Sequence, residues 1–224
     1  MEAISEKTIV ALEGQVNTFE NTLLLMRSLG VDLSKVGEKY KGDHLYQATH
    51  ILFGRNLVLL LSGYQSALTG LYGTARTLMR IILENAFLMR YFASHPDEAK
   101  SWVKDVDWYN KKRPSEIRRA LFQGKLLKDY SQAYKALSSY VHPSVDGWTE
   151  LLVPRGHNIV FIRYDPDYEE DLATDTLTLL LFLSKLTLKP ILMSFKPEIG
   201  EVRLRDLSEI QEKIDQFLPP DTVS

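Results

Sequence analysis

The sequence LYGTARTLMRIILENAFLMRYFAS, residues 71–94, decides the fold. Its apolar residues recur with the spacing of a long helix, and Arg76, Arg80 and Glu84 interrupt the apolar face. These three residues are spaced i, i+4 and i+8, so they stack on one side of a helix. Because Leu83 and Phe87 flank them, the pattern predicts a charged pair inside or beside the core.

Two interpretations of this charged pair stay open at the level of sequence. A partly buried carboxylate beside guanidinium groups can bind an anion or position a proton donor. Alternatively, Arg80 and Glu84 form an intrahelical bridge that also fixes a neighbouring helix. Removing one partner of such a buried pair costs about 3–5 kcal/mol. We favour the structural interpretation.

Composition is that of an ordinary soluble globular protein. Of 224 residues, 45% are hydrophobic and 25% are charged, which is enough apolar sequence for a sizeable core. The net charge of −2 lacks the basic excess that is typical of nucleic-acid-binding proteins. There is no cysteine, so disulfides, thiolate nucleophiles and cysteine-based metal sites are excluded. We expect a cytoplasmic protein.

Two apolar stretches must be distinguished from membrane-spanning helices. Residues 57–75 carry no charge and have about the length of a span, but they include several serines, glycines and threonines. The run Leu177–Leu183 is too short, and lysines follow it. The N-terminus carries acidic residues early and lacks the basic start of a signal peptide. We therefore expect buried core helices and no membrane association.

Local signals predict the first half of the chain to be helical. We expect a helix from about Ser5 to Ser28 that Gly30 stops, followed by a polar connection over residues 31–42. Asp43 is expected to cap a second long helix. A turn near Thr69-Gly70 then joins this helix to the 71–94 helix, so that the two run antiparallel.

The second half is expected to be helical around one small sheet. Pro96 and Pro114 each suit the first turn of a helix, and residues 125–140 form a further helix. Two apolar runs around a turn-rich segment predict a β-hairpin near 148–164. A long apolar helix follows over about 168–195, and Pro190 is expected to kink or end it.

The predicted fold class is therefore mainly all-α. We predict a single-domain helical bundle over residues 1–224 with one small β-hairpin. The core spans about residues 43–195, flanked by an N-terminal helix within residues 1–30 and a C-terminal helix over 203–218. Residues 219–224 are expected to form a loose tail.

A second group of candidate site residues lies in the stretch ALSSYVHPS, residues 136–144. Ser138 and His142 are spaced i, i+4, which would bring them together if the helix extends that far. A Ser–His contact alone does not make a hydrolase, because a triad also needs a carboxylate and an oxyanion hole. We favour capping by His142, with a shared polar site as the alternative. The full candidate polar site is Arg76, Arg80, Glu84, Ser138, Ser139, Tyr140 and His142.

Basic and aromatic residues alternate between Trp102 and Arg119. Such a segment can stack on single-stranded nucleic acid and neutralise it. More often the aromatic residues fold inward and the charges are solvated, which we favour. The residues of this nucleic-acid candidate are Lys111, Lys112, Arg113, Arg118 and Arg119.

Metal and cofactor sites have no support in the sequence. The five histidines are scattered and form no HExxH or other i, i+4 pair. No glycine-rich phosphate-binding motif is present. We therefore expect no metal and no cofactor.

The stretch around residues 71–94, with Arg80 and Glu84, and the later Ser139, His142 and Pro143 resemble a bacterial all-helical family classified only as a domain of unknown function. The resemblance covers about residues 46–195. That family is distantly similar to HEPN helical domains, which dimerise and in some members cleave RNA without metal. The HEPN motif Arg-x(4–6)-His has one match here, Arg90 to His95, with Tyr91 in place of the usual polar residue.

We expect a non-enzymatic binding or regulatory protein with a polar Arg/Glu/His pocket. We also expect a homodimer, because apolar helix surface is abundant and because the resemblance implies one. Nucleic acid is a less favoured ligand. One alternative is a HEPN-like, metal-independent ribonuclease or a toxin–antitoxin or defence component. In that case His142 would be the acid/base, and Arg76 or Arg80 would stabilise the developing charge. Another alternative is a structural subunit in which the polar cluster only locks helix packing.

Overall fold

The fold of the described chain is all-α. The computed structural model describes residues 2–105, 107–141, 152–154, 160–162, 166–195 and 199–219. Its helices are α1 (Glu2–Ala11), α2 (Glu13–Lys35), the 3-10 helix η1 (Gly37–Tyr40), α3 (His44–Leu68), α4 (Tyr72–Ser94), α5 (Pro96–Lys104), α6 (Trp108–Lys111), α7 (Pro114–Leu121), α8 (Gly124–Ser139), α9 (Glu170–Phe195) and α10 (Glu201–Asp215).

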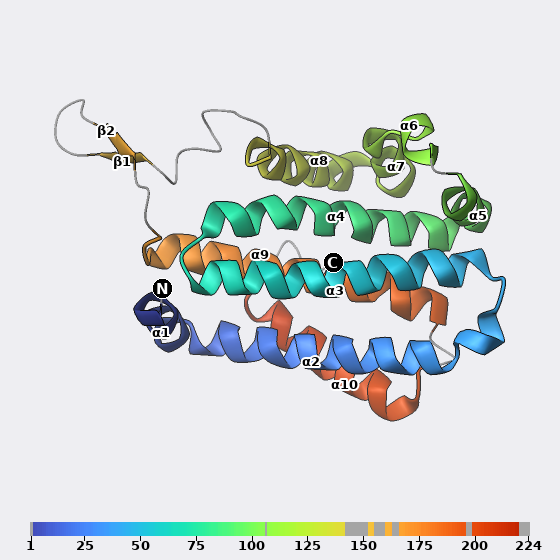
Figure 1. The fold of residues 1–224 in the computed structure, drawn as a ribbon, viewed down its shortest axis with the longest axis horizontal. Coiled ribbons are helices and arrows are strands. Elements are labelled where there is room, and N and C mark those ends of the chain that lie inside the picture. The colour runs from blue at the N-terminus through green and yellow to red at the C-terminus, as the bar shows by residue number, and fades with distance from the viewer. Residues whose placement is uncertain are drawn as a thin grey trace.

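The stretch that decides the fold forms α4, the helix at the centre of the bundle. α4 packs most extensively against α3 and α9, and α2 packs against α3 and α9. The second half of α4 is buried almost all round, from Leu83 through Phe92. A helix that is apolar on nearly every side must be enclosed, and Figure 1 shows α3, α9 and the row α5–α8 around it.

The predicted turn near Thr69-Gly70 is confirmed. Gly70 has a φ of +78°, and its N–H donates to Ala67 O while the Leu71 N–H donates to Ser66 O. This pair of bonds is a Schellman motif, which satisfies the last carbonyls of α3. A side chain at position 70 would also meet Asp167, since its Cβ would lie 2.5 Å from the Asp167 carbonyl oxygen.

The predicted cap of the second long helix is confirmed as well. The Asp43 carboxylate accepts hydrogen bonds from the N–H groups of Leu45 at 2.8 Å and Tyr46 at 3.1 Å. These donors belong to the first turn of α3, which has no intrahelical acceptors for them.

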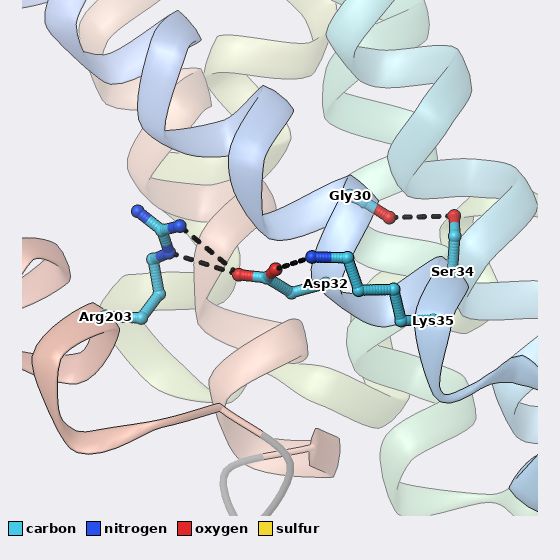
Figure 2. A network of polar contacts seen from close by, with 5 residues as sticks. All are labelled: Gly30, Asp32, Ser34, Lys35 and Arg203. Carbon is cyan, nitrogen blue, oxygen red and sulfur yellow. Dashed lines mark hydrogen bonds and ion pairs between the residues drawn. The ribbon is translucent and has the colours of Figure 1, made fainter.

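The expected stop at Gly30 is wrong. The N-terminal segment breaks instead at Leu12, and α2 continues through Gly30 to Lys35. Buried Leu29 and Leu33 hold this last part of α2 against the core, so tertiary packing overrides the weak helix propensity of glycine. The Ser34 hydroxyl also donates to the Gly30 carbonyl at 2.9 Å (Figure 2). Part of the predicted polar connection over 31–42 is therefore helical.

An ion pair joins the C-terminal helix to the end of α2. Arg203 from α10 donates to Asp32 at 3.3 Å, and Lys35 contacts the same carboxylate at 3.2 Å (Figure 2). Leu207 and Ile214 of α10 are buried in the core. The predicted C-terminal helix over 203–218 is thus present, and it begins two residues and ends three residues earlier than expected. Residues 220–224 of the predicted tail lie outside the described residues.

A buried polar network connects the three central helices. The Asn56 amide of α3 donates to Ile82 O at 3.1 Å and to the Thr187 hydroxyl at 3.0 Å. Asn85 of α4 donates to the Asn56 oxygen at 2.8 Å. Both asparagines and Thr187 are buried, so every polar group of the Asn56 side chain is paired inside the core.

The apolar helix α9 lies within the bundle. Pro190 does not end it, since the helix continues to Phe195. Among the described helices, α9 is the one long and apolar enough to cross a membrane. Of its most apolar 18-residue stretch, 56% is buried inside the bundle. A mostly buried helix of this composition is typical of a bundle centre.

Two three-residue strands occur within the predicted hairpin region. β1 (Leu152–Pro154) and β2 (Val160–Ile162) pair antiparallel, with Val153 opposite Phe161. The rest of the predicted 148–164 hairpin lies outside the described residues. The hairpin in its full predicted extent therefore stays a prediction.

We expect Gly70→Ala to lower the free energy of unfolding by more than about 2 kcal/mol. The substitution forces an alanine into left-handed backbone, which costs about 1–2 kcal/mol, and places its Cβ against the Asp167 backbone. Gly42→Ala is the matched control, because Gly42 has a φ of +85° but no atom within 4 Å of the added Cβ. Urea unfolding of both variants measures the difference. Equal losses would show that the Asp167 contact is unimportant.

We expect Asn56→Ala to lower the free energy of unfolding by about 2–4 kcal/mol. It removes the acceptor of the Asn85 amide and one donor each to the Ile82 carbonyl and the Thr187 hydroxyl. A buried polar group left unsatisfied costs about 1–3 kcal/mol. The exposed Asn21→Ala on α2 is the control and should change stability by less than about 0.5 kcal/mol. Chemical denaturation measures both. An Asn56→Ala variant as stable as the control would contradict a stabilising network.

Candidate functional site

The candidate site is built on Arg80, Glu84 and Tyr134. The Arg80 guanidinium lies 3.4 Å from the Glu84 carboxylate, as the i, i+4 spacing predicts. Tyr134, from α8, joins the two, since its hydroxyl accepts from Arg80 at 2.9 Å and donates to Glu84 at 2.7 Å. The Arg80 and Glu84 side chains are 19% and 22% exposed, so the pair is partly shielded and retains contact with solvent.

Two more arginines contact tyrosines of the same region. The guanidinium carbon of Arg118, on α7, lies 3.9 Å from the centre of the Tyr134 ring. Arg76 donates to the Tyr140 hydroxyl at 2.6 Å and lies over its ring. Guanidinium groups stack favourably on aromatic faces. We call Arg76, Arg80, Arg118, Tyr134 and Tyr140 the arginine–tyrosine cluster.

The electrostatics keep the Tyr134 hydroxyl protonated at neutral pH. Burial raises the pKa of Tyr134, and its hydrogen bond to Glu84 raises it further. Burial by itself lowers the pKa of Arg80, but Tyr134 and Glu84 more than offset this and raise it. Tyr134 is therefore a fixed donor to Glu84, and Arg80 stays charged.

Arg118 has unused hydrogen-bonding capacity. Its Nε and Nη1 atoms are buried and have no hydrogen-bond partner among the described residues. A cavity of about 10 Å³ lies next to it, lined by Glu84, Phe87, Leu88, Pro114, Ile117 and Arg118. This volume is about that of one water-sized sphere. The site is therefore nearly closed, with room for a single polar atom.

The predicted serines Ser138 and Ser139 make local hydrogen bonds within α8. Ser138 donates to the Tyr134 carbonyl at 2.7 Å, and Ser139 donates to the Ala136 carbonyl at 2.7 Å. Both bonds are local helix contacts of the kind that serines often make near a helix end. His142 lies outside the described residues, so the expected Ser138–His142 contact and the capping role of His142 stay predictions.

The basic side chains of the predicted nucleic-acid segment contact different parts of the protein. Lys111 pairs with Asp105 at 2.6 Å and Lys112 with Glu98 at 2.8 Å. Arg118 turns inward to Tyr134. Of the five basic residues, Arg113 and Arg119 are exposed and carry no such contact in the part of the chain that the structure describes. The five therefore do not form one continuous basic surface.

Glu98 is a polar centre that the sequence analysis missed. Its carboxylate accepts from Trp108 Nε1 at 2.9 Å, Lys112 at 2.8 Å and the Tyr91 hydroxyl at 3.3 Å. Trp108 is buried, so the expectation that this aromatic residue folds inward is confirmed. The bond to Lys112 contributes most to lowering the pKa of Glu98. The signal available in the sequence was only a glutamate in the first turn of α5.

The HEPN-type match does not form a joint site. His95 stacks on Tyr91 with ring centres 4.3 Å apart, and its ring nitrogen contacts the Tyr91 carbonyl. Arg90 instead lies over the Phe122 ring. The two side chains thus have separate aromatic partners. Within the described residues, no group of three or more potential metal ligands comes together.

Comparison with known proteins adds no evidence on function: no family model, curated protein or solved structure matches the chain. The resemblance to a bacterial helical family therefore stays a prediction. Any assignment of function rests on the geometry of the site. The contacts of Tyr134 with Arg80 and with Arg118 were not predicted, because each joins residues from two different helices.

We expect Glu98 to make stability sensitive to acid. Its folded pKa lies below the unfolded value of about 4.3. Glu98 therefore contributes stability above that pH, and this contribution is lost as the pH falls from about 5 toward the folded pKa. Urea unfolding from pH 7 down to pH 3 should show a steeper loss for the wild type than for Glu98→Gln. Glu116→Gln, exposed on α7, should parallel the wild type.

A Glu98→Gln curve parallel to that of the wild type across the same pH range would assign the acid sensitivity to other groups.

Proposed function

We propose that the protein is a non-enzymatic binding or regulatory module that holds an anionic group at the arginine–tyrosine cluster. The observation that carries this proposal is Arg118. Its guanidinium carbon lies 3.9 Å from the centre of the Tyr134 ring, while two of its N–H donors are buried without a hydrogen-bond partner among the described residues. A ligand oxygen that reaches them would recover the free energy lost by leaving buried donors unpaired.

The chemistry of the cluster favours an oxyanion. Guanidinium groups bind carboxylates and phosphates through two parallel N–H bonds, which a lysine cannot supply. The small cavity at Arg118 and Glu84 has room for one oxygen atom. The body of the ligand would lie outside it, toward the solvent-exposed edge of Arg80 and Glu84.

Binding is better supported than acid–base catalysis. Glu84 is engaged by both Arg80 and Tyr134. The raised pKa of Tyr134 moves its hydroxyl further from neutral pH, whereas an efficient general acid or base titrates near the working pH. The groups are therefore arranged to hold each other in fixed positions.

A metal-independent ribonuclease is the second proposal. One observation favours it: Arg76 binds the Tyr140 hydroxyl at 2.6 Å, and Thr77 binds the Tyr140 carbonyl at 3.2 Å. These contacts hold the chain against α4 two residues before His142. In this proposal His142 is the acid/base and Arg76 stabilises the developing negative charge. RNA cleavage in EDTA that His142→Ala abolishes would replace the binding proposal.

The binding proposal is tested with inorganic phosphate. We expect phosphate to raise the melting temperature of the wild type above that in sodium chloride of equal ionic strength. At a phosphate concentration of about 100 Kd the stabilisation is about 2.7 kcal/mol. Arg118→Gln should lose this response, because it removes the guanidinium that the ligand contacts.

Arg119→Gln is the matched control, since Arg119 is the exposed neighbour on α7. It should retain the full phosphate response. Isothermal titration calorimetry gives the same comparison without heating. An equal response of the two variants, or no response in the wild type, would contradict an anion site at Arg118.

A further inference from the structure

The outer face of α2 and α3 carries apolar side chains that no part of the described chain covers. Leu24 is 61% exposed on α2, and Val58 is 64% exposed on α3. α2 and α3 run side by side across the front of the molecule, with α9 and α10 behind them (Figure 1). We call this surface the α2–α3 face; its residues are Glu20, Leu23, Leu24, Arg27, Gly30, Val31, Ile51, Gly54, Leu57, Val58 and Leu61.

The exposed residues of this face follow a heptad pattern. On α2 they recur at Glu20, Leu24, Arg27 and Val31, and on α3 at Ile51, Gly54, Val58 and Leu61. Alternating spacings of three and four residues keep one narrow stripe of each helix facing the same way. Each helix therefore has a second stripe in addition to the one buried in the core; it is mostly apolar on α3, and on α2 it alternates leucine and valine with charged residues. Such a stripe is what a helix needs to pack against another helix.

A groove runs along the face between the two helices. One part has a volume of about 520 Å³ and is lined by residues that include Leu24, Val58 and Leu61. The other part, about 480 Å³, lies beside Gly30, Val31 and Gly54. Arg27 and Leu57 line both parts, so the groove is continuous. Gly30 and Gly54 have no side chains to fill the groove, so a partner side chain can approach the backbone there.

The charges of the face are self-complementary. Glu20 and Arg27 both line the groove, and they lie equally far on either side of the Leu23–Leu24 peptide bond. If a second α2 crosses antiparallel about that point, each Glu20 meets the Arg27 of the other copy. The same two-fold axis places Leu23 and Leu24 of the two copies against each other. An isologous interface requires this kind of self-complementarity.

We propose that the α2–α3 face binds a second copy of the chain, with the two α2 helices antiparallel about Leu23 and Leu24. The α2 and α3 helices of both copies then form a four-helix bundle across the two-fold axis. This arrangement covers the exposed leucines and valines, and it pairs the charges within the groove. The proposal is independent of the anion site.

The size of the face is adequate for such a dimer. The two helices have 23 and 25 residues, and are about 35 Å long and 10 Å wide each. Together they present about 700 Å² per copy, close to the ~800 Å² that each partner buries in a standard interface.

Charge reversal tests both the partner and its orientation. Arg27→Glu places two glutamates opposite each other, and Glu20→Arg places two arginines opposite each other, so each variant alone should dimerise at least about 100-fold more weakly. An equimolar mixture restores two Glu–Arg pairs and should form a heterodimer. Sedimentation equilibrium measures the wild type, each variant and the mixture. Lys128→Glu, exposed on α8, is the control and should dimerise like the wild type.

Leu24→Ser with Val58→Ser gives a second test without a change of charge. Both side chains are mostly exposed in the single chain, so circular dichroism should show an unchanged helical fold while the dimer is lost. A wild type that stays monomeric at high micromolar concentration would overturn the proposal. So would a dimer that the charge reversals leave intact, or a mixture that remains monomeric.

Discussion

The hydrogen bonds of Asn56 are the constraint on which the arrangement of the core depends. This one side chain joins α3 to Ile82 and Asn85 of α4 and to Thr187 of α9. Apolar contacts between helices tolerate sliding, because many registers bury similar area, but a buried amide is satisfied in only one register. The network therefore fixes how far each central helix is shifted along its neighbours. The same network thereby fixes the position of Arg76, Arg80 and Glu84 along the bundle axis relative to the neighbouring helices.

Local chemistry accounts for the features that sequence predicted well. Asp43 caps α3 and Gly70 turns the chain because each acts on backbone groups within a few residues. The Arg80–Glu84 pair is likewise set by helix geometry alone. Gly30 failed as a stop signal because Leu29 and Leu33 gain more from burial than the glycine costs. Competition between local preference and packing is not visible until the neighbouring helices are placed.

The partners of the site residues could not be predicted for the same reason. Tyr134 lies 50 residues from Glu84 and 54 from Arg80, and its position depends on how α8 crosses α4. Arg118 belonged in the sequence to a basic segment with Lys111 and Lys112. The structure separates them, because α7 turns Arg118 toward Tyr134 while the lysines pair with carboxylates near α5. The spacing of the basic residues along the chain therefore allowed a continuous basic surface, which was the less favoured interpretation and which the fold does not form.

The outer side of α4 is covered by other helices of the chain, whereas no described part of the chain covers the α2–α3 face. The chain covers the outer side of α4 with α7 and α8, and the arginine–tyrosine cluster lies in that layer. Figure 1 shows α8 and α2 on opposite sides of the α3–α4 pair. A second copy on the α2–α3 face would therefore not cover the cluster in either copy. Anion binding and dimerisation do not compete for surface, so phosphate should leave the dimer equilibrium unchanged unless the central helices shift against one another. The Asn56 network opposes that shift.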